Sequence, residues 1–422
     1  MEGEMADKRI LNKLVDLQGT NFEILDVEVN KDEIVWKISH RNKAYYICPN
    51  CHKKHKYAYD KAWIIIKDIP LGKKKMIWHV NRARIICKCH YRPLVEFLPF
   101  RSIHHRLTQR LVNLIEELLC TKMFTVADVA RLFEIDYGIV YKIDHELLWR
   151  LIDSINIPHP ENISVDEKSF RKGHKYVTVV TDIDSKKVIW VSEGRRKESL
   201  DEFFKIIGPE GCKKIKTVAK DLHEPYALSI NEYIPHAKII ADKFHVIKKL
   251  NETLNECRKE LERQSDLNVT RSKKRSEQLQ WVLRYKNKKL HPGQLETLNV
   301  LQKVNERLYK AYLLKEYFYN IFDFKPSEIN EAKDFLLLWI KKAKKYGFIA
   351  LQEFVKFLER HFRIILNIIL FQRTTAVSEG INRKISVIKC MAYGYRNIQY
   401  FMLKIMQRCG ILGDRDVPIS NA

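Results

Sequence analysis

The chain has 422 residues, more than one compact core normally holds, and this length indicates several domains. Hydrophobic residues make up 45% of the chain and aromatic residues 11%, which excludes a wholly disordered protein. Lys and Arg outnumber Asp and Glu by 76 to 52, and the resulting net charge of +24 favours a polyanionic partner such as nucleic acid.

Neither export nor membrane insertion is expected. The stretch MEGEMADKRI at the amino terminus is charged and lacks the apolar core of a signal peptide. No run reaches the roughly 18 apolar residues of a membrane span, and the most apolar stretch, 362–371, reads as a buried helix. We therefore expect a cytoplasmic protein whose nine cysteines are reduced.

Two close pairs of cysteines predict a structural zinc site. Cys48-Pro-Asn-Cys51 is typical of a tight turn that directs two thiolates at one Zn²⁺, and Cys87-Lys-Cys89 supplies a second pair. The runs 62–69 and 75–86 between the pairs are rich in Ile, Val and Trp and predict strands. The region 45–95 is therefore interpreted as a zinc ribbon with one bound ion.

The spacing of the second pair leaves the ligand set open. One intervening residue strains a shared chelate, so His90 is an alternative ligand within Cys87-x-x-His90. His52 and His55 are weaker candidates. The competing interpretation is a set of reduced, unliganded cysteines on a strand pair.

Residues 101–155 change to helical periodicity. Thr125 is the expected N-cap of a helix over 126–133, and after a break at 134–136 another helix begins at Tyr137. Two short helices around a tight turn predict a helix-turn-helix whose second helix enters a major groove, although a generic three-helix bundle shows a similar pattern. The candidate DNA contacts are Arg131, Tyr137, Tyr141 and Lys142.

From residue 162 the pattern alternates between strands and helices. The expected strands are 163–166, 176–181, 188–191, 215–221 and 238–241, with helices over 199–207 and 226–233. This order is that of a ribonuclease-H-like sheet, in which the first and fourth strands are neighbours.

Asp166 and Asp221 end those two strands, so their carboxylates are expected to face one another. A two-Mg²⁺ phosphoryl-transfer site requires such a pair, because hard cations take oxygen ligands. Asp182 and Asp184 are weaker candidates, since a turn between paired strands is an ordinary place for Asp.

Five short stretches together resemble one family. They are VDEKSF at 165–170, ADKFHV at 241–246, LKE at 314–316, SEGINRKI at 378–385 and AYGYRN at 392–397. In this order the chain is similar, from about residue 45 onward, to the ISL-three family of bacterial insertion-sequence transposases. The resemblance implies a DDE transposase whose ribonuclease-H-like core is split by a helical insertion.

For this chain, the resemblance implies a catalytic triad of Asp166, Asp221 and Glu379, which would hold two Mg²⁺ or Mn²⁺ ions. The long separation between Asp221 and Glu379 is consistent with a helical insertion, because residues 247–372 have helical apolar spacing almost throughout. The alternative for Glu379 is a Glu that merely favours a helix amino terminus.

Other residues near the implied triad have supporting roles. Asp242 and His245 match a secondary Asp-x-x-His signature and are interpreted as a supporting pair rather than metal ligands. Arg383 and Lys384 are further candidate DNA contacts. Trp281 in the insertion could stack on a distorted base, but the preferred interpretation is a core tryptophan.

The predicted fold is therefore a multidomain α+β protein. Its expected parts are 1–100 with the zinc ribbon, 101–155 with the helix-turn-helix, 156–250 as the first part of the core, 251–372 as an all-helical insertion and 373–422 as the C-terminal core helices.

The expected function is that of an insertion-sequence transposase at the bacterial nucleoid. It would bind the terminal inverted repeats of its element and target DNA as a homodimer or larger assembly. It would catalyse metal-dependent cleavage and strand transfer. The alternative is a transposase-derived DNA-binding regulator without catalysis, and a third possibility is a nuclease of the same fold.

Overall fold

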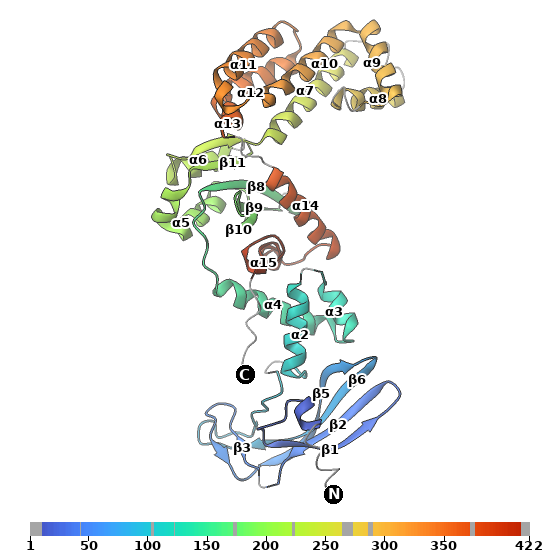
Figure 1. The fold of residues 1–422 in the computed structure, drawn as a ribbon, viewed down its shortest axis with the longest axis vertical. Helices are drawn as coiled ribbons and strands as arrows, with labels where there is room; N and C mark the ends of the chain where they lie inside the picture. The colour runs from blue at the N-terminus through green and yellow to red at the C-terminus, as the bar shows by residue number, and fades with distance from the viewer. Residues whose placement is uncertain are drawn as a thin grey trace. The chain divides into compact units, whose positions relative to one another are not determined.

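The computed structural model describes residues 11–42, 44–102, 105–121, 123–171, 175–221, 224–263, 273–285, 290–371 and 376–414. The chain forms two units, Met1–Ile155 with Leu412–Ala422, and Asn156–Ile411. Each unit contains a five-stranded sheet of its own (Figure 1). Among the described helices, none has the length and apolar character that a membrane crossing needs.

The first unit begins with a mixed sheet of order β1-β2-β6-β5, with the short β7 pairing with β6. The strands are β1 (Phe22–Val29), β2 (Glu33–His40), β5 (Asp60–Leu71), β6 (Lys74–Ile85) and β7 (Leu94–Val95). Its core gathers around the fully buried Trp78, with Ile38, Ile66 and Val80 beside it. β5 and β6 contain the expected strands, whereas β1 and β2 were not anticipated from the sequence.

A separate small cluster lies beside this sheet. The hairpin of β3 (Tyr46–Ile47) and β4 (Lys54–His55) brings Tyr46 and Cys48 against Ala83, Ile85 and Cys87 at the end of β6. This cluster therefore has its own buried core within the region expected to be a zinc ribbon.

Three helices follow in the first unit: α2 (Gln109–Cys120), α3 (Val126–Leu132) and α4 (Tyr137–Asp153). The predicted N-cap at Thr125 is confirmed, because its side chain accepts from the backbone of Asp128 while Asp128 bonds back to Thr125. The tight turn before α4 places Glu134 at φ 48°, and Asp136 caps α4. The helices share one apolar core around Ile115, Val129 and Val140.

The second unit is built on a sheet of order β10-β9-β8-β11-β12. β8 pairs antiparallel with β9 and parallel with β11, and β11 runs parallel to β12. The strands are β8 (Asn162–Arg171), β9 (Lys175–Asp182), β10 (Lys187–Glu193), β11 (Thr217–Lys220) and β12 (Lys238–Ala241). The helices α5 (Lys197–Lys214) and α6 (Glu224–Tyr233) pack on the sheet through Phe203, Phe204 and Tyr226.

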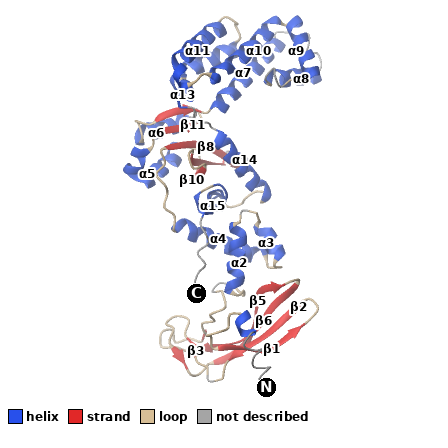
Figure 2. Cartoon of the chain, in the orientation of Figure 1, coloured by secondary structure: helices blue, strands red, loops and turns tan. Residues whose placement is uncertain are grey.

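Helices make up the described residues from 243 to 371, which contain no strand (Figure 2). They are α7 (Lys243–Arg263), α8 (Lys273–Arg284), α9 (Pro292–Val304), α10 (Glu306–Phe318), α11 (Ile329–Lys344), α12 (Ile349–Arg360) and α13 (Phe362–Phe371), with short 3₁₀ turns at Tyr319–Asp323 and Pro326–Glu328. They enclose one large apolar core around Phe318, Trp339 and Phe354.

The expectation of a core Trp281 is wrong. Leu279, Val282 and Leu283 occupy the buried face of α8, so Trp281 falls on its outer face, 50% exposed and stacked on Tyr285. One residue along a helix turns about 100° around the axis, and this rotation separates Trp281 from the buried side.

After the helical segment the chain returns to the sheet. Asn367 of α13 donates to the carbonyl of Ile239 in β12 over 2.7 Å, which explains an amide within an otherwise apolar helix. α14 (Ala376–Met391) then runs along β8, and α15 (Ile398–Cys409) packs against β10. Two segments far apart in sequence, β8 and α14, therefore lie side by side.

Candidate active site and metal cluster

Two aspartates lie side by side where the parallel pairing of β8 with β11 ends. The prediction that the first strand ends at Asp166 is wrong, because β8 stays paired with β9 and continues to Arg171. In the register of this pair, Lys220 is opposite Val165, so the next positions along are Asp221 and Asp166. Neighbouring strands are about 4.8 Å apart, and the register alone therefore brings the two carboxyl groups within reach of a shared cation.

The two aspartates line a small open pocket together with Asp242, which follows β12. The other lining residues are Ser164, Val165, Ala219, Lys220 and Ser378. Three carboxylates from three adjacent strand ends therefore converge on one hollow. Carboxylate oxygens are the preferred ligands of Mg²⁺, so the donor set fits this ion.

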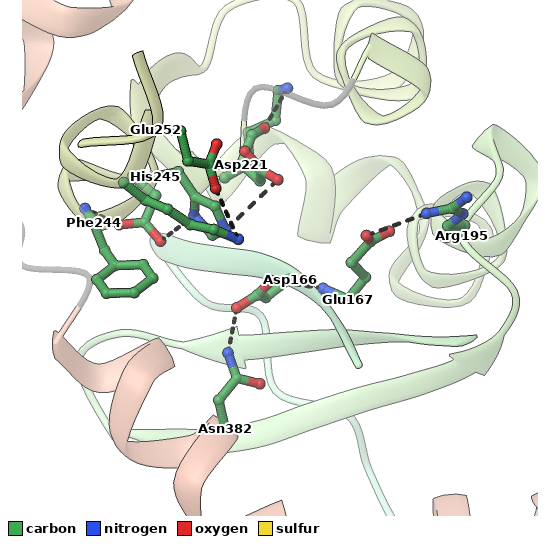
Figure 3. A network of polar contacts seen from close by, with 11 residues as sticks. Asp166, Glu167, Arg195, Asp221, Phe244, His245, Glu252 and Asn382 are labelled. Atoms are coloured by element: carbon green, nitrogen blue, oxygen red, sulfur yellow. Dashed lines mark hydrogen bonds and ion pairs between the residues drawn. The ribbon is translucent and has the colours of Figure 1, made fainter. Parts of the chain in front are cut away.

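The helix α14 closes one side of the pocket through two polar contacts. Asn382 donates from Nδ2 to Oδ2 of Asp166 over 2.5 Å, as Figure 3 shows. The hydroxyl groups of Ser378 and Ser164 lie 2.5 Å apart, both buried. Because Ser378 and Asn382 are four residues apart, they share the face of α14 that is turned to the strands.

On the opposite side, His245 of α7 connects two of the carboxylates (Figure 3). Its Nδ1 lies 2.8 Å from Oδ2 of Asp242, and its Nε2 lies 3.7 Å from Oδ2 of Asp221. Asp242 is itself fixed, because its Oδ1 accepts from the backbone N–H of Phe244. His245 therefore links the two carboxylates, by a hydrogen bond to Asp242 and by a longer ion-pair contact to Asp221.

The pocket brings three carboxylates close together, and their charges shift the pKa values of the groups around them. Burial raises the pKa of Asp166, and the neighbouring charge of Asp242 adds to the effect, while the bonds from Asn382 and the Glu167 N–H oppose it. Burial lowers the pKa of His245, but the bond to Asp242 and the charges of Asp221 and Asp166 outweigh burial and raise it. Both shifts describe negative charge gathered in one place, which a bound divalent cation would neutralise.

Glu379 lies on the first turn of α14, one residue after Ser378. Its Oε1 accepts from a guanidinium nitrogen of Arg383 over 2.6 Å, and both side chains are largely exposed. The structure thus brings Asp166 and Asp221 together and puts Glu379 on the adjoining helix, with its carboxylate turned toward Arg383. Lys384, the next residue, is also exposed.

Five metal-binding side chains gather in the first unit. Sγ of Cys48 lies 3.5 Å from Sγ of Cys89, and Sγ of Cys51 lies 3.5 Å from Sγ of Cys87. The ligand atoms of Cys48, Cys87, Cys89 and His90 all lie within 4.8 Å of one another. Since Zn²⁺ takes four such ligands at about 2.0–2.3 Å, the cluster fits a structural zinc ion with one donor to spare.

The two turns that carry these donors share a backbone form. His52 and Tyr91 each follow a turn, each has a positive φ near 55°, and each donates its N–H to the carbonyl four residues back, at Cys48 and Cys87. His90 therefore occupies the position in the second turn that Cys51 occupies in the first.

The donors differ in their hydrogen bonding and in the pKa values of their thiols. Nε2 of His90 is buried without a hydrogen-bond partner in the structure. Burial would raise the pKa of Cys48, but bonds from the N–H groups of Cys51 and Asn50 lower it to about 6, whereas burial and the neighbouring sulfurs raise the pKa of Cys89 to about 12. His52 and His55 lie outside the tight cluster, although Nε2 of His55 is also buried without a partner.

The candidate DNA contacts of the first unit are accessible. Arg131 is highly exposed and pairs with Asp128, and Lys142 is exposed on α4. Tyr137 and Tyr141 stack with their ring centroids 6.3 Å apart on the outer face of the same helix. These four side chains thus lie on or beside the helix expected to enter a major groove.

Sequence reasoning missed Asn382 and Ser378 as parts of the site. Both fall within the stretch 378–385, whose spacing of four residues on a helix was a usable signal. Nothing in the sequence indicated that Ser164 would meet Ser378, because that contact depends on the long-range return of α14.

Comparisons with known proteins give consistent matches. A family model described as transposase matches residues 163–405, and a model described as the zinc-finger of transposase IS204/IS1001/IS1096/IS1165 matches residues 45–90. The chain is 28% identical over 404 residues to the transposase for insertion sequence element IS1001 of Bordetella parapertussis, covering 95% of this chain and 98% of that protein.

A second relative is also similar over most of the chain. The transposase for insertion sequence element IS1557 of Mycobacterium tuberculosis is 26% identical over 417 residues, covering 89% of this chain and 90% of that protein. The matches run through both units, so the similarity includes the metal cluster, the aspartate pocket and the helical segment between β12 and α14.

Proposed function

The chain belongs to the ISL-three family of insertion-sequence transposases, and we propose that it cuts and rejoins DNA at a two-metal site formed by Asp166, Asp221 and Glu379. The observation that carries the proposal is the adjacency of Asp166 and Asp221, the residues that follow the last paired positions of β8 and β11, Val165 and Lys220. The strand order β10-β9-β8-β11-β12 supports a ribonuclease-H-like core, in which this is the position of the catalytic aspartates.

Mg²⁺ or Mn²⁺ would be held by the two aspartates and by Glu379 once its carboxylate leaves Arg383. Two such ions supply activation of the attacking oxygen and stabilisation of the leaving one. Asn382 and His245 hold Asp166 and Asp221 in place, so that the ligands are oriented before the ions bind. Asp242 faces the pocket but is engaged by His245, which favours its supporting role.

The reaction consists of two in-line displacements. Water attacks the phosphorus at the element end and breaks its bond to the 3′ oxygen, which leaves as a 3′-hydroxyl. That hydroxyl then attacks a phosphorus of the target strand, forms the new phosphodiester and releases a target 3′-hydroxyl. Neither step needs a covalent protein intermediate.

The first unit supplies DNA recognition in this proposal. One structural Zn²⁺ is held by Cys48, Cys51 and Cys87, with Cys89 or His90 as the fourth ligand. The helices α3 and α4 form a helix-turn-helix that reads the terminal inverted repeats, with Arg131, Tyr137, Tyr141 and Lys142 at the DNA. Arg383 and Lys384 contact DNA beside the active site. Two copies hold the two ends, in the cytoplasm where the chromosome lies.

The test is a strand-transfer assay with purified protein. Its substrates are labelled DNA duplexes that carry the element ends flanking the protein's own gene. The proposal predicts nicking and joining at those ends with Mg²⁺ or Mn²⁺ and neither reaction in EDTA. Tight binding without cutting under either metal would favour the alternative, a transposase-derived DNA-binding regulator. Cutting without joining would instead indicate a nuclease of the same fold.

A further inference from the structure

The sheet of the first unit has two edges of very different character. The edge strand β1 is interrupted by a bulge between Ile24 and Asp26, and its carboxylates Asp26 and Glu28 are paired with Lys37. Bulges and charged side chains are the usual means by which an edge strand avoids pairing with another chain. The edge formed by β1 is therefore protected.

The opposite edge, β5, has no bulge over residues 61–65, and Lys61 is the only charged residue of that segment. Its register with β6 is continuous from Asp60 to Asp68. Trp63 and Ile65 point outward from the sheet, 54% and 52% exposed, while Ile66 faces the core. A regular edge strand with a large exposed aromatic and a β-branched side chain favours pairing with a further strand.

No residue that the structure describes forms a backbone hydrogen bond to the outer side of this edge over residues 61–65. Lys67 of β5 already bonds outward, because its N–H donates to Arg106 and its carbonyl accepts from Thr108. Outward-facing groups recur at every second residue, so the N–H and carbonyl groups of Lys61, Trp63 and Ile65 point to the same side. Among the described residues, no strand pairs with these three on that edge.

We propose that residues 61–65 of β5 pair antiparallel with the same residues of a second copy, joining two first units through a continuous sheet. A two-fold axis at Trp63 places the two Trp63 rings across from one another. It also places each Lys61 opposite Ile65 of the other copy, so that no like charges face each other directly. The segment is thus complementary to itself, in keeping with an interface in which both copies use the same patch.

The pattern of side chains on this edge favours a second copy of the chain over DNA as the partner. The apolar side chains of Trp63 and Ile65 offer no favourable contact to the phosphate backbone of a DNA duplex. The two lysines of the strand, Lys61 and Lys67, lie on either side of this apolar pair and do not cover it. The C-terminal end is closed by the segment at Arg106–Thr108 that bonds to Lys67, so the added strand is confined to about five residues. Such a short pairing buries less than the standard interface of ~1,600 Å², and a micromolar dissociation constant is expected.

The inference rests on the proposed function only in that joining two DNA ends calls for two copies. The test needs neither DNA nor divalent metal, so its failure is distinct from a failure of the proposed chemistry. Sedimentation equilibrium of the full chain, loaded with zinc, should show a monomer–dimer equilibrium. A monomer throughout the range up to about 100 µM would overturn the proposal.

Charge substitutions at Trp63 provide the decisive comparison. Trp63→Lys and Trp63→Glu should each raise the dissociation constant at least about tenfold, because like charges then face each other across the axis. An equimolar mixture of the two variants should dimerise again, and a mixture that remains monomeric would contradict the two-fold register. Leu25→Lys on the protected edge, where Leu25 is 48% exposed, is the matched control and should leave the equilibrium unchanged.

A backbone variant separates strand pairing from general hydrophobic contact. The N–H of Ile65 points to the open edge, so Ile65→Pro removes no bond within the sheet and is compatible with an edge strand. It should weaken the dimer while zinc content and thermal midpoint stay at wild-type values. An undiminished dimer would show that β5 does not pair. If the wild-type chain is monomeric and Trp63→Lys alters only DNA affinity, the edge contacts nucleobases and the proposal is wrong.

Discussion

Asn382 donates a hydrogen bond to Asp166 across 2.5 Å, and this contact joins α14 to the strand that carries the first aspartate. The two residues are more than two hundred positions apart, separated by the entire helical segment. The contact leaves Oδ1 of Asp166 to the N–H of Glu167, 2.7 Å away, so both carboxylate oxygens are oriented by the protein.

Replacing Asn382 should therefore slow catalysis without weakening DNA binding. Asn382→Leu removes the donor at similar volume, and loss of such an orienting bond typically costs about 10–100-fold in activity. Single-turnover cleavage, measured beside a DNA-binding titration, tests this. Val387→Ala, at an exposed position of the same helix, should cleave at the wild-type rate. Equal cleavage by Asn382→Leu and wild type would contradict the role.

Zinc content should depend on the two cysteines that begin the turns. Because the cluster has one donor to spare, Cys48→Ser or Cys87→Ser alone leaves four donors, whereas the double variant leaves three. The double variant should therefore lose the single ion per chain, while Cys390→Ser, at an exposed cysteine, should keep it. Atomic emission on purified protein measures the stoichiometry. Retention of one zinc by the double variant would mean that the ion is held elsewhere.

The fourth zinc ligand can be determined by replacing the ion with Co²⁺. Absorption bands of a three-sulfur, one-nitrogen site differ from those of a four-sulfur site, and His90→Ala should change the spectrum only if the histidine is bound. The repeated backbone form of the two turns favours His90. An unchanged spectrum in His90→Ala, together with loss of the bands in Cys89→Ser, would assign Cys89 instead.

The ion pair of Arg110 with Asp68 should stabilise the first unit. The Asp68 side chain is fully buried and accepts from Thr108 and Arg110, while Arg110 is a quarter exposed. Removing one partner of a buried pair leaves an uncompensated charge, so Arg110→Met should destabilise this region by roughly 3 kcal/mol. Hydrogen exchange of amides in β5 and α2 measures the effect locally.

A matched exposed pair provides the control for that experiment. Arg84 and Asp60 pair in the same sheet but are both more than a third exposed, so Arg84→Met should change exchange far less. If both substitutions accelerate exchange equally, burial of Asp68 is not what makes its pair important.

DNA affinity should depend on α4 through its phosphate contacts. Lys142→Ala should weaken binding uniformly across sequences and reduce the slope of log affinity against log salt by about 1. The control is Lys213→Ala, an exposed lysine at the end of α5 that forms an ion pair with Glu210. If Lys142→Ala leaves the slope of log affinity against log salt unchanged, the DNA does not bind on α4.

Local patterns predicted much of this architecture. Alternation of apolar residues predicted the strands that became β8 and β11, and register then brought Asp166 and Asp221 to adjacent positions. The N-cap at Thr125 was predictable because capping depends on residues three positions apart.

Features set by long-range packing were not predictable. The contact of Asn382 with Asp166 depends on where α14 returns to the sheet. The ion pair of Glu379 with Arg383, by contrast, is a local contact between residues four apart on one helix. Strands β1 and β2 were missed, although their alternation was present, and Trp281 was assigned to a core because its exposure depends on which face of α8 is covered. The open edge at Trp63 appears only once the strand order is known.

The central claim is that Asp166, Asp221 and Glu379 together hold the metals that cleave DNA. It is tested most directly by single-turnover cleavage of an element-end duplex in Mg²⁺ with Asp166→Asn, Asp221→Asn and Glu379→Gln, and with Asp182→Asn as the carboxylate control. We expect the first three to bind DNA as wild type does and to lose cleavage by at least about a thousandfold, and the control to cleave normally. Near-wild-type cleavage by Glu379→Gln would contradict the assignment of the third carboxylate. Such cleavage by either aspartate variant would contradict the site itself.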